Sequence, residues 1–145
     1  MKNEIIVRSP SFGLMHFKGL FGLFKQTPKL QRLSTIRQLG PLYIIYPGAQ
    51  HMRLLHAMEV AYTALTISSK LNLPKDEIEC LGVAGLLHDL GHGPYSHSTE
   101  ILFNELFNED HMDFTCQLIT GERNLPVDDD EKKIVKFGQI PIILR

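Results

Sequence analysis

The chain has 145 residues, of which 43% are hydrophobic and 21% charged, and its formal net charge is −1. This length and composition are typical of one soluble globular domain with a hydrophobic core. No stretch is long and apolar enough to span a membrane, no signal peptide is recognisable, and two cysteines exclude a disulfide framework, so we expect a cytoplasmic protein.

The first 40 residues are basic and only partly readable as secondary structure. They contain seven lysine and arginine residues and one glutamate, whereas the rest of the chain has eight against fifteen acidic residues. A basic segment can face phosphates or nucleic acid, but we prefer a solvated helix face as the explanation. The run 5–7 predicts a short strand, and Gly13, Gly19 and Gly22 argue against one long helix.

The first clear helix signal is at Thr27 and Pro28, an N-cap followed by proline at the first helical position. The periodicity predicts a helix over 28–39 that stops at Gly40 and Pro41. Its apolar stripe consists of Leu30, Leu33, Ile36 and Leu39.

Further helices are predicted after a turn at residues 46–50. They cover residues 51–71, 76–90, 98–107 and 110–119. Asn72 and Pro74 end the first of these, Asp76 caps the second, and Gly91 and Gly93 break it. Because almost every segment is helical, the predicted fold class is all-α.

An imidazole and a carboxylate stand side by side at His88 and Asp89, at the end of an apolar run. Burial of both groups is costly unless they are paired or bind a metal. The small residues Gly82, Ala84 and Gly85 allow another helix to approach this one closely.

If that neighbour is the 51–71 helix, His56 becomes a natural partner of His88 and Asp89. Two imidazoles and a carboxylate suit a divalent transition metal or Mn²⁺, which activates water and neutralises phosphate oxygens. His92 and His97 follow on a glycine-rich turn, where an imidazole can act as a general acid or hold a phosphate. A lone histidine is usually structural, but six of the seven histidines lie between residues 51 and 111, which favours a functional cluster.

These segments resemble the HD-domain phosphohydrolase superfamily, and most closely its deoxynucleoside triphosphate triphosphohydrolase branch. The matching stretches are TPKLQRLSTIRQLG, YPGAQHMRLLHAMEV and GLLHDLGHGPYSH, followed by His111. They cover about half of the chain in the family's order, and HDLGHGPYSH is far more specific than a bare His-Asp pair. The resemblance implies an HD-domain helical bundle, incomplete at its C-terminal side.

The resemblance also implies a role for each matching residue. His56, His88 and Asp89 match ligands of a divalent ion, which the sequence does not identify among Mn, Mg, Fe and Zn. Asp89 is also counted with the catalytic residues. Arg53 matches an arginine that contacts the substrate phosphates, a task that the fork of a guanidinium suits.

Five further positions carry an implied role. His92, His97 and His111 match histidines on the phosphate and acid/base side of the site, where they are catalytic. Gln38 and Leu39 match positions near the deoxyribose of the substrate. Core packing explains Leu39 equally well.

One departure from the family concerns the fourth metal ligand, an aspartate in a downstream segment similar to DVDRLDY, which is missing here. Asp113 and the run 128–130 are the only later aspartates, and Met112 stands where relatives commonly carry glutamate. We therefore expect a fragment or short form that binds metal weakly and hydrolyses little on its own. The apolar end at 140–144 predicts self-association, so a homo-oligomer is one expected assembly.

The predicted division is an N-terminal segment 1–26, an HD core 27–121 and a tail 122–145 that begins a truncated continuation. The leading functional hypothesis is a metal-dependent phosphohydrolase that converts a dNTP to deoxynucleoside and triphosphate. The alternatives are a non-catalytic HD module that binds nucleotide or nucleic acid, and a phosphodiesterase or phosphomonoesterase that uses the same site.

Overall fold

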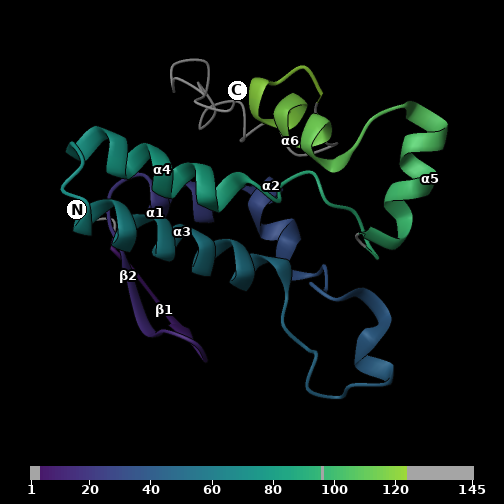
Figure 1. Cartoon of the computed structure of the whole chain (residues 1–145), viewed down its shortest axis with the longest axis horizontal. Coiled ribbons are helices and arrows are strands. Elements are labelled where there is room, and N and C mark those ends of the chain that lie inside the picture. The colour runs from purple at the N-terminus through teal and green to yellow at the C-terminus, as the bar shows by residue number, and fades with distance from the viewer. Residues whose placement is uncertain (1–3, 96, 124–145) are drawn as a thin grey trace.

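The computed structural model describes residues 4–95 and 97–123 of the chain. In chain order its elements are β1 (Ile5–Ser9), β2 (Gly13–Phe17), α1 (Phe21–Lys25), α2 (Pro28–Gln31), η1 (Arg32–Ser34), η2 (Gly40–Ile44), α3 (Arg53–Lys70), α4 (Lys75–Leu87), α5 (His97–Phe107) and α6 (His111–Thr120). The fold is mostly helical, as the sequence predicts, with one small β-hairpin added (Figure 1). Among the described helices none is long and apolar enough to cross a membrane.

The centre of the fold is the pair α3 and α4, which lie side by side (Figure 1). The four residues between them reverse the chain, and Asn72 adopts a left-handed φ of 55° at this turn. The predicted close approach of the two helices is confirmed. A Cβ atom added at Gly85 would lie 3.1 Å from the Cα atom of Ala61 in α3, so the two backbones are almost in contact.

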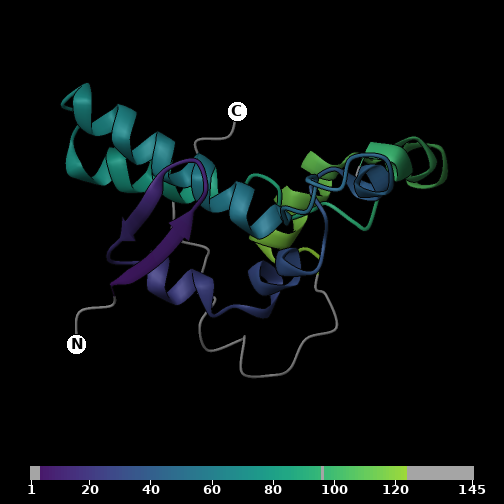
Figure 2. The same cartoon turned by 90° about the horizontal axis from the view of Figure 1, so that it is seen from below.

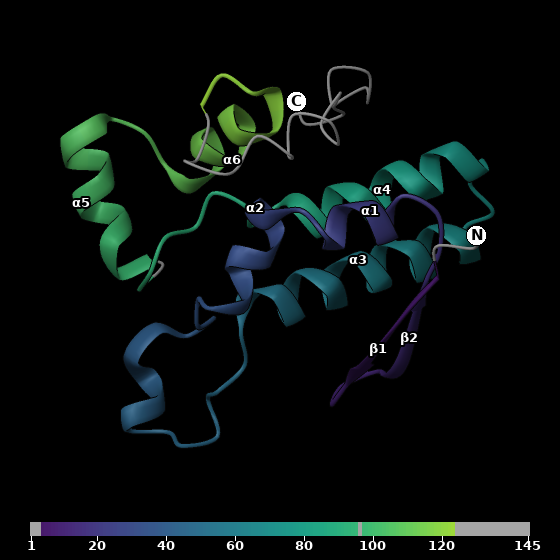
Figure 3. The same ribbon diagram turned by 180° about the vertical axis from the view of Figure 1, so that it is seen from behind.

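The hairpin and α1 cover one side of this helix pair (Figures 2 and 3). Strand β2 directs Met15 and Phe17 into the core, where they are 0% and 2% exposed. The hairpin is also fastened to α3, because Ser9 Oγ donates a hydrogen bond of 2.5 Å to Glu59 Oε1. The predicted strand at 5–7 is therefore confirmed and is two residues longer.

The predicted helix over 28–39 is wrong beyond its first turns. Thr27 does cap α2, but α2 ends at Gln31 and a single 3-10 turn follows to Ser34. Thr35 Oγ1 donates to the carbonyl of Arg32 at 2.8 Å, and such local bonds from threonine compete with helix propagation. The chain then extends, and Ile36 accepts a hydrogen bond from the amide of Arg53 at 2.9 Å.

The later helices agree with the prediction except at the ends of α4. Pro74, not Asp76, occupies the N-cap of α4, and the helix ends at Leu87, before the His-Asp pair. Helix α6 begins in a capping box formed by Asp110 and Asp113. The predicted division into three segments stays a prediction, and most of the predicted tail, including the aspartates at 128–130 and the apolar end at 140–144, lies outside the described residues.

The close approach at Gly85 leads to a stability prediction for Gly85→Ala. The added Cβ meets backbone atoms of α3, which cannot rotate away, so we take the upper part of the overpacking cost, about 2–3 kcal/mol. The gain in helix propensity returns about 1 kcal/mol, which leaves a net destabilisation of about 1–2 kcal/mol. Gly48→Ala is the control, because nothing lies within 4 Å of a Cβ atom added there. Urea unfolding followed by circular dichroism measures both variants. Equal midpoints for Gly85→Ala and Gly48→Ala would contradict the packing described here.

Candidate metal centre

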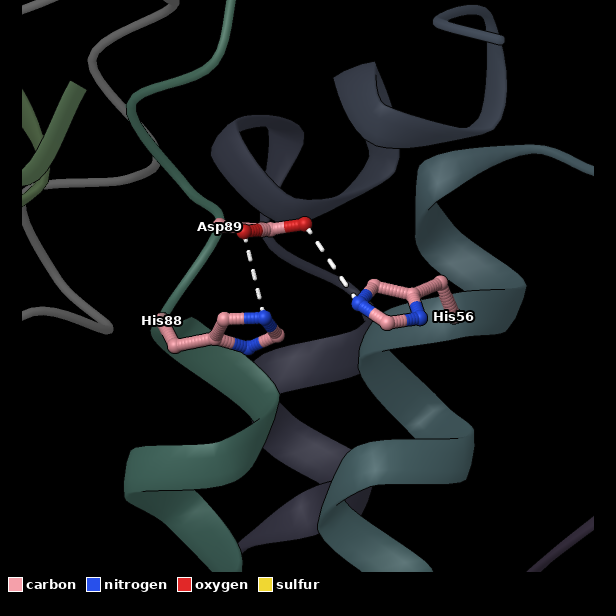
Figure 4. Close-up of side chains that lie close together, drawn as sticks. All are labelled: His56, His88 and Asp89. Carbon is pink, nitrogen blue, oxygen red and sulfur yellow. Dashed lines mark ion pairs between the residues drawn. The ribbon is translucent and has the colours of Figure 1, made fainter. Parts of the chain in front are cut away.

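The His-Asp pair lies on a short turn that begins where α4 ends. After Leu87 the backbone hydrogen bonds join residues three positions apart instead of four. The amide of Leu90 donates to the carbonyl of Leu87 at 3.0 Å, and the amide of His92 donates to the carbonyl of Asp89 at 3.2 Å. Residues 88–92 are called the HD turn below. Because α4 ends at Leu87, His88 and Asp89 lie at the end of α4 that faces the start of α3 (Figure 4), and glycines flank His92 in the same turn.

His56 on α3 faces this pair across the gap between the two helices (Figure 4). Its Nε2 atom lies 3.7 Å from Asp89 Oδ2, and His88 Nε2 lies 3.1 Å from Asp89 Oδ1. The two imidazole rings meet edge to face at 5.4 Å between centroids. One ligand atom from each of the three residues lies within 4.8 Å of the other two.

Arg53 forms a buried ion pair with Asp89 one helical turn before His56. The distance from Arg53 Nη1 to Asp89 Oδ2 is 2.5 Å, and the two side chains are 1% and 8% exposed. Burial alone would raise the pKa of Asp89, but the hydrogen bond from His88 and the charges of His88 and Arg53 outweigh it and hold this pKa far below its usual range. Asp89 is therefore a permanent anion at neutral pH.

The two histidines of this group titrate differently. Burial lowers the pKa of His56 below its ordinary value despite the attraction of Asp89. Burial acts in the same direction on His88, but hydrogen bonds to Asp89 and to the carbonyl of Gly85 outweigh it and raise the pKa of His88. Because Gly85 O, 2.8 Å from His88 Nδ1, can only accept, Nδ1 carries a proton, and Nε2, which faces Asp89, is the nitrogen that binds a metal once it is deprotonated.

A second group of titratable residues lies beside the first. His92 is 3% exposed, its Nε2 atom lies 3.5 Å from Asp89 Oδ1, and its ring stacks on that of His111 at 4.1 Å. His111 Nδ1 in turn is hydrogen-bonded to Glu100 Oε1. A chain of contacts therefore runs from Asp89 through two imidazoles to a carboxylate on α5.

Glu100 is a candidate that sequence reasoning missed. It lies in the first turn of α5, where an acidic residue is usually explained by the helix dipole. Only the approach of α5 to the start of α6 brings Glu100 to His111, and no periodicity in the sequence encodes that contact.

The remaining predicted site residues are less closely tied to this cluster. His97 is the first residue of α5, and its side chain lies outside the described part of the chain. Gln38 Oε1 is buried and has no hydrogen-bond partner among the described residues. Leu39 is 43% exposed, so core packing is the wrong explanation for it.

The donor set of His56, His88 and Asp89 fits a divalent ion. Ligands bound to one ion at about 2.1 Å lie about 3.0–3.4 Å apart at angles of about 90–109°, so three donors within 4.8 Å of one another can share an ion after adjustments of about 1 Å. Asp113 is not available as a further ligand without a cost, because its carboxylate accepts from the amide of Asp110 at 3.1 Å in the α6 cap.

The chain is similar to several curated proteins. It is 39% identical over 105 residues to the deoxynucleoside triphosphate triphosphohydrolase SAMHD1 of Danio rerio, a match that covers 68% of this chain and 17% of that protein. It is 41% identical over 102 residues to the uncharacterized protein YwfO of Bacillus subtilis, covering 66% of this chain and 22% of YwfO. The chain thus spans about a fifth of the length of the curated relatives it matches.

A solved structure and a family model extend this similarity. A hypothetical protein from Aquifex aeolicus superposes with a TM-score of 0.73 at 31% identity, covering 92% of this chain and 33% of that one. The model of the HD domain matches residues 53–136, more than half of the chain, and this range includes His56, His88 and Asp89. By sequence, by fold and by the His-Asp pair at the end of α4, the chain belongs to the HD domain family.

Proposed function

We propose that this chain forms the catalytic core of a metal-dependent nucleotide phosphohydrolase, and that it cleaves a dNTP to deoxynucleoside and triphosphate. The observation that carries the proposal is the convergence of His56, His88 and Asp89 from α3 and the end of α4. The name of the similar SAMHD1 proteins supports a phosphohydrolase and suggests the nucleotide class.

In this proposal His56, His88 and Asp89 hold a divalent metal ion, which when bound activates water and neutralises phosphate oxygens. Arg53 holds the Asp89 carboxylate through Nη1, and the further N–H donors of a guanidinium are the groups proposed to contact phosphate oxygens. The hydrogen bond from Gly85 O keeps the proton of His88 on Nδ1, so that Nε2 faces the ligand group.

The second group supplies the acid. Glu100 orients the ring of His111 through a hydrogen bond to Nδ1, and the stacked ring of His92 connects it to Asp89. A protonated imidazole held in this way donates its proton to the leaving oxygen of the nucleotide. His97 at the start of α5 and the pair Gln38 and Leu39 stay proposed contacts to phosphate and deoxyribose.

One observation favours a second candidate, an HD module that binds nucleotide without turnover. The described residues supply three protein ligands only, and Asp113 is engaged in the cap of α6. A divalent site with one carboxylate has less compensating negative charge than a site with two, so its affinity for metal is lower.

Metal binding and a nucleotide panel test the proposed function directly. Protein purified without chelator is assayed with Mn²⁺, Mg²⁺, Fe²⁺ and Zn²⁺ against dNTPs, with deoxynucleoside and triphosphate separated by chromatography. We expect the unmodified chain to release triphosphate slowly. His88→Ala should abolish both this release and metal binding, whereas His51→Ala, at an exposed position, is the control and should change neither. Metal binding without turnover would support the non-catalytic module, and release of monophosphate would point to a different phosphate-ester chemistry.

Arg53→Lys separates phosphate binding from metal binding. The lysine keeps a positive charge near Asp89 but lacks the fork of the guanidinium. We therefore expect turnover to fall by about 10- to 100-fold, which corresponds to the loss of one charge-assisted hydrogen bond, and metal content to stay unchanged. Steady-state kinetics and metal analysis measure the two quantities on one preparation. Arg8→Lys, an exposed site on β1, is the control. Unchanged turnover in Arg53→Lys would remove Arg53 from phosphate binding.

The raised pKa of His88 predicts that metal binding depends on pH. A proton on Nε2 of His88 competes with the metal, whereas the lowered pKa of His56 leaves that ring neutral at pH 7. Affinity for Mn²⁺ is therefore expected to be full at high pH and to decline as the pH falls through the His88 pKa. Calorimetry in buffers of different ionisation enthalpy should detect a proton release that approaches one per ion as the pH falls below the His88 pKa. Release of no proton at pH 6.5 would contradict the assignment of His88.

A further inference from the structure

The HD turn is held by an arginine from a distant part of the chain. Arg32, on η1, donates from Nη2 to the carbonyl of Leu90 at 2.6 Å and from Nη1 to the carbonyl of His92 at 2.9 Å. These carbonyls come after the end of α4, where no helical amide is available to them. Both bonds join residues 58 or 60 positions apart, so they fix the turn relative to the N-terminal segment.

The partners of Arg32 are unusual for a partly buried cation. Burial lowers the pKa of the Arg32 guanidinium, and among the described residues no carboxylate pairs with it. Its Nε atom is buried without a hydrogen-bond partner in the described residues. A cation placed here without an ion pair depends on its two carbonyl bonds, and the planar fork of arginine matches two acceptors at once.

The opposite side of the HD turn is held by α6. The amide of Gly91 donates to Thr115 Oγ1 at 2.8 Å, and Thr115 Oγ1 donates to the carbonyl of His88 at 3.3 Å. Thr115 thus holds the peptide group after His88, and Arg32 holds the one after His92. Both residues hold the peptide group between Leu90 and Gly91, from two sides. Asp89 lies within the stretch that they hold.

We propose that Arg32 is a positioning residue for the candidate metal centre. By holding the carbonyls of Leu90 and His92, it sets the direction in which Asp89 and His92 leave the backbone. Arg32 touches neither metal nor substrate in this scheme and acts through the HD turn. The expected effect of Arg32 on metal binding rests on the proposed function. Its expected effect on hydrogen exchange in the turn rests on the geometry of the turn alone.

The test compares Arg32→Gln and Arg32→Lys with the unmodified 145-residue chain. Glutamine removes the charge and the fork, whereas lysine keeps the charge and reaches one carbonyl. Arg37→Gln is a matched control, because Arg37 lies five residues later and bonds to the side chain of Gln50 rather than to the turn. Two quantities are measured: the dissociation constant for Mn²⁺, and hydrogen exchange of the Gly91 amide in metal-free protein, relative to amides in the middle of α3.

We expect Arg32→Gln to weaken Mn²⁺ binding by about 10- to 100-fold, the range found when groups that orient metal ligands are removed. The Gly91 amide should exchange at least about tenfold faster while α3 amides keep their rates, since only the turn is released. Arg32→Lys should fall between Arg32→Gln and the unmodified chain. Arg37→Gln should match the unmodified chain in both quantities.

Two outcomes would overturn the role of Arg32. The first is unchanged Gly91 exchange in Arg32→Gln, and the second is equally faster exchange throughout α3 and the turn, which indicates a general loss of stability. If the unmodified chain binds no Mn²⁺, the proposed function fails, and Gly91 exchange alone still decides whether Arg32 positions the turn.

Discussion

The buried ion pair between Arg53 and Asp89 joins the start of α3 to the turn after α4, and the arrangement of the site depends on it. Its two atoms lie 2.5 Å apart with almost no solvent exposure. Removing either partner leaves an uncompensated buried charge, which costs about 3–5 kcal/mol. The pair therefore sets the register of α3 against α4 at the end where His56 and His88 face each other, and the near-contact at Gly85 sets their separation farther along.

The same pair determines the charge of the centre. Asp89 is the one carboxylate among its ligand group, and Arg53 already neutralises it. A divalent ion added here would leave a surplus of positive charge in a partly buried place, which only an anionic ligand can balance. A polyphosphate is such a ligand. In the proposed function, metal and nucleotide would each strengthen the binding of the other, a reciprocity required by thermodynamic linkage.

Helices with strong periodicity and the residues on their faces were predictable from the sequence, as α3 and α4 demonstrate. The meeting of His56 with His88 and Asp89 followed from helical spacing and from the small residues at the interface. The contacts that were missed connect segments without a shared period. The stretch after Ser34 leaves the helix because Thr35 bonds back to the chain, and the partnership of Glu100 with His111 requires α5 to reach α6.

The two glycines around His92 differ in the space that surrounds them. A Cβ atom at Gly91 would lie 2.4 Å from the carbonyl of His111, so this glycine is a packing surface pressed against α6, whereas nothing lies within 4 Å of one at Gly93. Gly91 therefore admits no side chain unless α6 moves, whereas the space around Gly93 would admit one. The HD turn and the start of α6 are therefore held against each other both by this backbone contact at Gly91 and by the hydrogen bond from the Gly91 amide to Thr115.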